Sequence, residues 1–233
     1  HAIDHDDVSK THYLDKNAKK MTHLACKWYR AIMPGDTTST PVGWAPEAED
    51  DHYDENFTEW LNASGTVGTD GTGGVDTDPR TRRVYAGAAV LDPMGEKVAF
   101  MYCKVPGRQT VPRAELTALI RTLRCIREAR SWTIYIDAQY VINGVHANDK
   151  SFYLLGRNGD LWQEVYDEID KLSNAGINEI RFIKAKSHVT TDEEWERYDM
   201  TEETYIHNEM ADHVCEIASK KFTSTLAIKQ DSD

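Results

Sequence analysis

Four carboxylates stand out in the sequence because each ends a predicted strand or lies in a predicted helix. Asp70 ends a short predicted strand after residues 66–69 (TVGT), and Asp137 ends the apolar run 132–136 (WTIYI). The carboxyl ends of strands are where α/β sheets place their ligands. Glu115 lies in the first turn of one predicted helix, and Asp212 lies in the last predicted helix. Each residue alone has an ordinary interpretation, since a strand-end Asp caps the next helix and a first-turn Glu suits the helix dipole.

As a group, these carboxylates predict a two-metal site. Four negative charges that meet at one edge of a sheet repel one another strongly unless divalent cations neutralise them. Carboxylate oxygens suit Mg²⁺, and phosphoryl chemistry uses two such ions about 3.5–4 Å apart, one to activate water and one to stabilise the leaving oxygen. We therefore expect two Mg²⁺ ions as cofactors, with Mn²⁺ as a substitute.

The overall charge of the chain limits how it can bind a polyanion. It carries 27 basic and 39 acidic residues, which give a net charge of −12. A protein this acidic is a poor non-specific binder of nucleic acid. Any phosphate backbone must therefore be held by a local basic patch or by bound cations.

Composition places the protein among soluble globular chains. Its 233 residues are 40% hydrophobic and 28% charged, enough for one large domain or two small ones. It has no apolar run of about 18 residues, so no membrane span is expected. Four cysteines lie far apart without a CxxC pair: Cys26, Cys103, Cys125 and Cys215. This usage fits a reducing compartment, and we expect an intracellular monomer in the nucleus or cytoplasm.

The chain divides near residue 68. Residues 1–68 carry 12 acidic and 6 basic side chains, with one predicted helix over 17–33 followed by prolines and an acidic run. We predict an acidic N-terminal extension over 1–68, a folded domain over 69–222 and a C-terminal tail over 223–233.

Apolar periodicity after residue 66 predicts strands first and then alternating helices and strands. Strands are expected at 84–91, 97–104, 132–136 and 180–183, after a first short strand that ends at Asp70. Helices are expected at 112–129, 138–146, 160–173 and 205–222. This order predicts an α/β domain with a mixed sheet.

From residue 66 to about 222 the chain resembles type 1 ribonuclease H, including the domains attached to reverse transcriptases. Six stretches occur in the family's order: 69–72 (TDGT), 107–116 (GRQTVPRAEL), 136–144 (IDAQYVING), 158–162 (NGDLW), 186–188 (KSH) and 208–212 (NEMAD). The resemblance implies an RNase H-like fold, a five-stranded mixed sheet flanked by helices. It also implies metal-dependent hydrolysis of the RNA strand of an RNA–DNA hybrid, and it allows an upstream reverse transcriptase domain as a partner.

The same resemblance implies roles for individual residues. The metal ligands correspond to Asp70, Glu115, Asp137 and Asp212. His188 matches the histidine thought to help protons and product leave. The implied substrate-binding set is Gly71, Arg108, Thr110, Gln139 and Asn158.

Within that set, Arg108, Thr110 and Asn158 resemble the family's pocket for a phosphate of the DNA strand, and all three side chains can donate to phosphate oxygens. Gln139 matches a residue at the minor groove, where 2′-hydroxyls identify RNA. Trp162, on an amphipathic helix, is expected in the core.

Two departures concern substrate binding. Many members of the family have an asparagine that helps to recognise the RNA where this chain has Val111 and Pro112. The stretch 146–157 is short, and its cations are Lys150 and Arg157. In this respect the chain resembles members that lack a basic protruding helix.

A third departure is an acidic insert over 190–203, which we interpret as a solvated loop. Four arginines recur every three residues along the helix predicted over 112–129 and just beyond it, and a solvated outer face is favoured over a phosphate-binding stripe: Arg121, Arg124, Arg127 and Arg130. Arg80, Arg82 and Arg83 are better candidates for contact with a nucleic-acid backbone.

Other functions of the same fold fit the motifs less well. Proofreading exonucleases place an Asp-x-Glu pair on the first strand, whereas Asp70 is followed by Gly71 and Thr72. Integrases and transposases carry their glutamate on a late helix, whereas Glu115 lies on the first. The alternative hypothesis is a non-catalytic nucleic-acid-binding or scaffold module of a larger polyprotein, which ranks second because all four carboxylates are retained.

Overall fold

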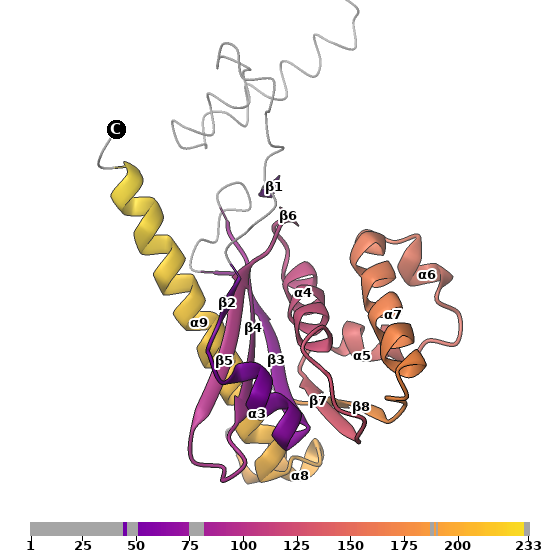
Figure 1. Ribbon diagram of the computed structural model, residues 1–233. Coiled ribbons are helices and arrows are strands. Elements are labelled where there is room, and N and C mark those ends of the chain that lie inside the picture. The colour runs from indigo at the N-terminus through magenta and orange to yellow at the C-terminus, as the bar shows by residue number, and fades with distance from the viewer. Residues whose placement is uncertain (1–43, 46–50, 75–81, 187–188, 190, 231–233) are drawn as a thin grey trace, which may run out of the picture.

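The computed structural model describes residues 44–45, 51–74, 82–186, 189 and 191–230. Its centre is a six-stranded mixed sheet with the strand order β2-β5-β4-β3-β7-β8 (Figure 1). The strands are β2 (His52–Tyr53), β3 (Thr66–Thr72), β4 (Tyr85–Leu91), β5 (Val98–Lys104), β7 (Trp132–Ile136) and β8 (Ile180–Lys184). A separate two-stranded pair joins β1 (Trp44–Ala45) to β6 (Gly107–Arg108).

The sheet combines an antiparallel half with a parallel half. β3, β4 and β5 pair antiparallel, whereas β7 pairs parallel to β3, and β8 pairs parallel to β7. Thr69 lies opposite Ile136 in the β3–β7 pair, so Asp70 and Asp137, which follow them, emerge side by side at one edge. The five expected strands are present, and the mixed sheet confirms the predicted fold class. The short edge strand β2 is an addition.

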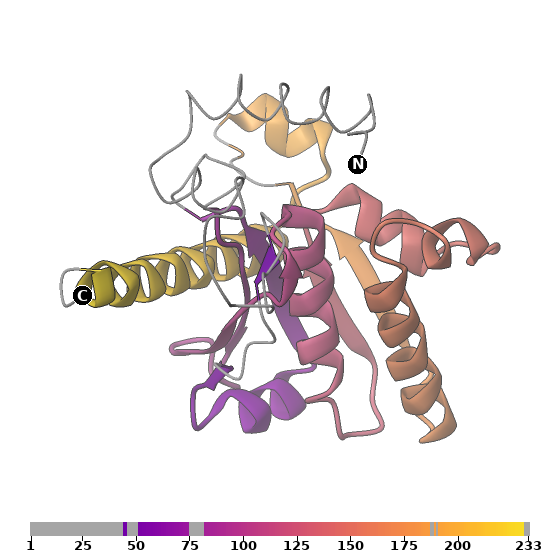
Figure 2. The ribbon, with the colours of Figure 1, turned by 90° about the horizontal axis from the view of Figure 1, so that it is seen from above.

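Helices cover both faces of the sheet (Figure 2). The long helix α9 (Glu202–Gln230) packs on one face, where Val214 and Ala218 meet Tyr85 and Ala89 of β4. The opposite face is covered by α3 (Phe57–Ser64), α4 (Val111–Leu123) and α7 (Gly159–Asn174). Three short helices complete the described part: α5 (Gln139–Val145), α6 (Ser151–Leu154) and α8 (Asp192–Arg197).

The core explains the two-sided pattern of the central strands. Ala88 and Val90 of β4 contribute to the cluster with α3, α4 and α7, whereas Tyr85 and Ala89 face α9. This alternation buries nearly all of β4, as expected of a strand covered on both faces. Trp162 of α7 is 1% exposed, which agrees with the core position predicted for it.

The folded part begins before residue 69. Phe57 and Leu61 of α3 are fully buried in the main core, and β2 pairs with β5. Both elements fall within the stretch that the sequence predicted as an extension. In α3 the apolar residues Phe57 and Leu61 lie one helical turn apart among acidic neighbours. Composition therefore did not indicate that this segment belongs to the core. The helix predicted over 17–33 lies outside the described residues.

Helix α4 ends at Leu123 instead of near residue 129, because Asn62 of α3 binds the chain just beyond it. The Oδ1 atom of Asn62 accepts hydrogen bonds from the backbone amides of Arg127 and Glu128, at 2.7 and 3.1 Å. Its Nδ2 atom donates to the carbonyl of Cys125. These bonds satisfy backbone groups that a longer helix would have used internally.

Two further elements differ from the expectation at the C-terminal end. The acidic insert contains α8 instead of an irregular loop, because Thr191 caps the helix by accepting a hydrogen bond from the amide of Glu194 and Trp195 packs on Tyr205 of α9. Helix α9 continues to Gln230, past the predicted end near residue 222. None of the described helices is long and apolar enough to cross a membrane.

Candidate active site

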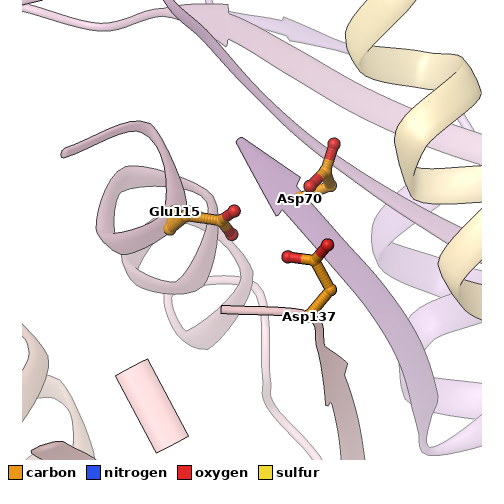
Figure 3. A group of neighbouring side chains, drawn as sticks. All are labelled: Asp70, Glu115 and Asp137. Atoms are coloured by element: carbon orange, nitrogen blue, oxygen red, sulfur yellow. The ribbon is translucent and has the colours of Figure 1, made fainter. Parts of the chain in front are cut away.

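Three of the four predicted ligands meet at the edge where β3 and β7 end. Asp70 comes from β3, Asp137 follows β7, and Glu115 reaches them from the first turns of α4 (Figure 3). One carboxylate oxygen from each residue lies within 4.8 Å of the others. The carboxylates point toward a common centre, which is the convergence that the sequence predicted for them.

Gly71 makes this convergence possible. A Cβ atom at position 71 would lie 2.4 Å from the backbone nitrogen of Glu115 and 2.8 Å from the Cβ of Ala114. Only a residue without a side chain lets α4 approach β3 so closely. Pro112 sits at the start of α4, where its fixed φ suits the first helical turn. The structure thus gives Gly71 a packing role, whereas its predicted contact with substrate stays a prediction.

The cluster holds like charges in a partly dry environment. Glu115 is 4% exposed, and burial, followed by the charges of Asp70 and Asp137, raises its pKa well above the ordinary value. Burial and the neighbouring Asp137 carboxylate also raise the pKa of Asp70 to about 6. The buried Oε2 atom of Glu115 has no hydrogen-bond partner among the described residues.

These properties fit divalent cations. An unpartnered buried carboxylate oxygen is costly unless a ligand completes it. Several hard oxygen donors within a few ångströms match the preference of Mg²⁺ and Mn²⁺. Asp70, Glu115 and Asp137 are therefore the residues that could hold such ions.

Asp212 lies near this cluster but is not one of its three members. It projects from α9, and its charge contributes to the raised pKa of Asp70. One turn further along α9, the thiol of Cys215 donates to the backbone carbonyl of Asp70 at 3.3 Å and ties that helix to β3. The assignment of Asp212 as a metal ligand stays a prediction. His188 lies outside the described residues.

The predicted DNA-phosphate residues lie in strand β6 and directly before two helices. Arg108 of β6 is exposed, and Thr110 at the start of α4 is exposed as well. Asn158 precedes α7, and its Nδ2 atom lies 3.5 Å from the hydroxyl of Tyr140. Gln139, at the start of α5, is exposed and donates to Asn143 at 2.9 Å.

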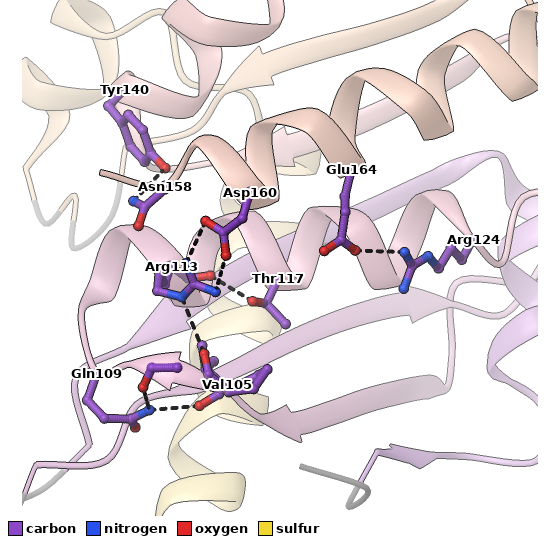
Figure 4. A network of polar contacts seen from close by, with 11 residues as sticks. Val105, Gln109, Arg113, Thr117, Arg124, Tyr140, Asn158, Asp160 and Glu164 are labelled. Atoms are coloured by element: carbon purple, nitrogen blue, oxygen red, sulfur yellow. Dashed lines mark hydrogen bonds and ion pairs between the residues drawn. The ribbon is translucent and has the colours of Figure 1, made fainter. Parts of the chain in front are cut away.

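A polar network that the sequence did not reveal supports these two helix starts (Figure 4). Arg113 of α4 forms a bidentate ion pair with Asp160 of α7, at 2.9 and 2.8 Å. This pair joins the N-terminal ends of the two helices and leaves Arg113 buried. Spacing alone gave no signal of it, because the partners lie 47 residues apart.

Gln109 holds the turn that carries Arg108. Its buried amide accepts a hydrogen bond from the backbone of Val84 at 2.9 Å and donates to the carbonyls of Val105 and Gly107, at 2.8 and 2.9 Å (Figure 4). Every polar atom of this side chain is therefore used to fix the backbone around β6.

Lys184, the last residue of β8, also reaches the site, although no motif in the sequence indicated it. Its Nζ atom donates to the backbone carbonyls of Asp137 and Ala185. Burial lowers the pKa of Lys184, whereas the charges of Asp137 and Glu115 act in the opposite direction. Only the register of β8 beside β7, which places Lys184 opposite Ile136, reveals this contact.

The four arginines that recur every three residues do not lie along a single helix, because α4 ends at Leu123. Arg121 pairs with Asp51 at 2.8 Å, and Arg124 pairs with Glu164 and Glu168 of α7. Arg127 and Arg130 lie beyond the end of α4 and donate to backbone carbonyls, those of Asn62 and Ala63 in the case of Arg130. Arg121 and Arg124 are therefore half-buried in ion pairs, whereas Arg127 and Arg130 are exposed, as the solvated face predicted for them requires. Arg80 lies outside the described residues, and Arg82 donates to the carbonyl of Gly73.

Comparison with known proteins decides the family. The family model described as RNase H matches residues 63–220. This chain belongs to the RNase H family. The match begins inside α3 and ends inside α9, so it covers the sheet and the three converging carboxylates.

Two curated relatives of this chain are ribonucleases H of bacteria. A ribonuclease H of Acetivibrio thermocellus is 35% identical over 86 residues, which cover 33% of this chain and 54% of the relative. One of Caldicellulosiruptor saccharolyticus is 28% identical over 88 residues, 34% of this chain and 57% of the relative. The chain spans about half the length of the curated relatives it matches.

Solved structures similar to this chain include a type 1 RNase H and a viral protease-reverse transcriptase. LC9-RNase H1, a type 1 RNase H with the type 2 active-site motif, superposes with a TM-score of 0.47 at 17% identity and covers 67% of this chain and 72% of its own. The foamy viral protease-reverse transcriptase in complex with RNA/DNA hybrid has a TM-score of 0.44 at 13% identity, with 86% and 27% covered. Likeness at this level concerns the backbone alone.

Proposed function

We propose that this RNase H family member is an endoribonuclease that hydrolyses the RNA strand of RNA–DNA hybrids with the help of two divalent cations. The observation that carries the proposal is the group of Asp70, Glu115 and Asp137, whose oxygens lie within 4.8 Å of one another. The unpartnered Oε2 of Glu115 supports it, because a cation would supply the missing partner.

Asp70, Glu115 and Asp137 would hold the ions, with Asp212 as a fourth ligand from α9. When bound, Mg²⁺ or Mn²⁺ supplies activation of a water molecule and stabilises the charge on the leaving oxygen. Asp70 and Asp137 lie on two adjacent strand ends, and Glu115 lies on a helix whose close approach Gly71 permits. We expect His188 to carry a proton away from the attacking water near neutral pH.

Recognition of the hybrid would use donors beside the carboxylate cluster. Arg108 and Thr110 are exposed on a turn that Gln109 fixes, and Asn158 lies at the adjoining start of α7. Guanidinium, hydroxyl and amide groups suit a phosphate of the DNA strand. Gln139, exposed on α5 directly after the site, suits the minor groove. Bound cations would offset the net charge of −12 at the point of contact.

A cleavage assay on three labelled duplexes tests the proposal. The purified 233-residue chain is incubated with RNA–DNA hybrid, duplex RNA and duplex DNA of the same sequence, in Mg²⁺, in Mn²⁺ and in EDTA. We expect cleavage of the RNA strand of the hybrid alone, with 3′-hydroxyl and 5′-phosphate ends and with either metal. Tight hybrid binding without any cleavage would support the scaffold alternative instead, and equal cleavage of duplex RNA would contradict hybrid specificity.

A further inference from the structure

Lys184 is a cation that the fold brings to the three-carboxylate cluster. It is the last residue of β8 and lies opposite Ile136, the residue before Asp137. Its Nζ atom donates to the backbone carbonyl of Asp137 and, at 2.5 Å, to that of Ala185. These bonds join the ends of two parallel strands at the edge that carries the site, and they hold the ammonium in place.

The ammonium interacts electrostatically with two of the three cluster residues. Lys184 donates to the backbone carbonyl of Asp137, and the charges of Asp137 and Glu115 attract its ammonium, whereas the like charge of Lys186 opposes them. The side chain is partly removed from solvent. Charge interactions between such partly buried groups are stronger than in bulk water, because the local dielectric constant is lower. One positive charge therefore offsets part of the repulsion among Asp70, Glu115 and Asp137 before any metal arrives.

We propose that Lys184 is an internal counter-cation of the carboxylate cluster, which stabilises the metal-free protein and weakens the binding of divalent cations. This inference rests on the proposed function, in which the cluster binds such cations. The ammonium and an incoming Mg²⁺ are attracted by the same carboxylates, and they repel each other. Lys184 thus acts as a positioning residue that sets how much metal the site requires.

Two consequences of opposite sign follow for a neutral substitution. Lys184→Met removes a charge that stabilises the metal-free cluster, so the protein should unfold at a lower temperature in EDTA than the wild type. The same change removes a charge that repels the metal, so Mn²⁺ should bind about tenfold more tightly. A lysine that only braced the strands would give weaker Mn²⁺ binding, because its loss would loosen the ligands.

The test uses the purified 233-residue chain without nucleic acid. Mn²⁺ affinity is measured by calorimetric titration for the wild type, Lys184→Met, Lys184→Gln and Lys184→Arg, and thermal unfolding is followed in EDTA and in excess Mn²⁺. Lys220→Met is the charge-matched control, because Lys220 is exposed and pairs with Glu216 on α9. We expect tighter Mn²⁺ binding in the two neutral variants, near wild-type affinity in Lys184→Arg and no change in Lys220→Met.

The outcomes separate this inference from the function on which it rests. Unchanged or weaker Mn²⁺ binding by Lys184→Met, with the wild type binding Mn²⁺, overturns the role of Lys184 and leaves the proposed function standing. If Lys184→Met does not fold, the affinity of Lys184→Gln decides in the same way. Absence of Mn²⁺ binding by the wild type itself overturns both.

Discussion

Two groups of charged residues differ in how their charges are neutralised. They are the arginines at residues 121–130 and the carboxylates at the sheet edge. Arg121 and Arg124 each pair with acidic side chains, and Arg130 donates to two backbone carbonyls. Asp70 and Glu115, by contrast, lie beside another carboxylate, and burial and like charge raise their pKa values.

The difference shows how a structural charge is distinguished from a functional one. Charges that hold a fold together are matched by partners that satisfy them, as Arg124 is by Glu164 and Glu168. Charges gathered in mutual repulsion lower stability and persist where a ligand relieves them. Periodicity in the sequence favoured a solvated outer face for the arginines, but the structure pairs Arg121 and Arg124 with acidic side chains.

The largest expected effect separates the two groups by activity. Asp137→Asn should reduce hybrid cleavage about 10³-fold or more, because a central carboxylate of the proposed metal site would lose its charge. Arg124→Ala should keep turnover close to the wild-type value and lower the free energy of unfolding by about 1 kcal/mol. Steady-state cleavage rates and urea unfolding of both variants provide the comparison.

Asp137→Asn should also fold normally, with a thermal midpoint no lower than that of the wild type in EDTA, because one repulsive charge is gone. The contrast between the groups breaks down if Asp137→Asn retains near-normal turnover, or if Arg124→Ala is the variant that loses it.

The repulsion at the cluster predicts a pH dependence of stability. In the absence of metal the pKa of Asp70 is about 6, above its ordinary value of 3.8, so the folded state binds more protons between these pH values than the unfolded state. The contribution of Asp70 to stability therefore falls as pH rises through about 6. Asp70→Asn should gain up to about 2–3 kcal/mol relative to the wild type between pH 4 and pH 7.5.

Urea unfolding in EDTA at both pH values measures this gain, and excess Mn²⁺ should shrink it at pH 7.5. A constant difference between Asp70→Asn and the wild type across this range would show that the cluster is not under electrostatic strain.

The approach of α4 to β3 can be disturbed without changing any charge. Gly71→Ala places a methyl group 2.4 Å from the backbone nitrogen of Glu115, so α4 must shift away from the strand. We expect a loss of about 1–3 kcal/mol in the free energy of unfolding and weaker Mn²⁺ binding, measured by urea unfolding and titration. Gly95→Ala is a control for substitution at glycine, because its Cβ would meet open space, although its positive φ carries a cost of its own. Unaltered Mn²⁺ affinity in Gly71→Ala would mean that Glu115 is not held by this packing.

The smallest effect concerns affinity for the hybrid. Arg108→Ala should weaken hybrid binding about 3- to 10-fold, because one phosphate contact is worth roughly 1 kcal/mol. Arg121→Ala should leave it unchanged, because Arg121 is paired with Asp51 on the face of α4 near β2. Fluorescence anisotropy at two salt concentrations distinguishes them, since loss of a phosphate contact also reduces the salt dependence. Equal losses from the two variants would restore the helical stripe as the binding surface.

The sequence predicted the part of the site that depends on strand ends. Asp70 and Asp137 end short predicted strands, and two neighbouring parallel strands bring such residues to one edge. Glu115 was predictable because a helix opened by Pro112 follows the hairpin. Their placement singled out these three residues, and the resemblance to type 1 ribonuclease H implied their role as metal ligands.

The remainder depends on contacts between distant residues. Asn62 binds the chain just beyond the end of α4, at Arg127, 65 residues later in the sequence. No helix pattern could show this contact. Phe57 and Leu61 belong to the core because α3 docks on β4 and β5, although their neighbours are acidic. Lys184 reaches Asp137 because of the register of β8 beside β7. Such features require the tertiary structure and cannot be read from spacing.

Metal-dependent turnover of a labelled RNA–DNA hybrid by the wild-type chain tests the central claim most directly. The initial rate of RNA cleavage is measured as Mg²⁺ is added to protein first stripped of metal with EDTA. The carboxylate cluster of Asp70, Glu115 and Asp137 predicts no cleavage in EDTA and a rate that rises with Mg²⁺ until the site is saturated. Cleavage that continues undiminished in excess EDTA would contradict the assignment of this cluster as the catalytic metal site.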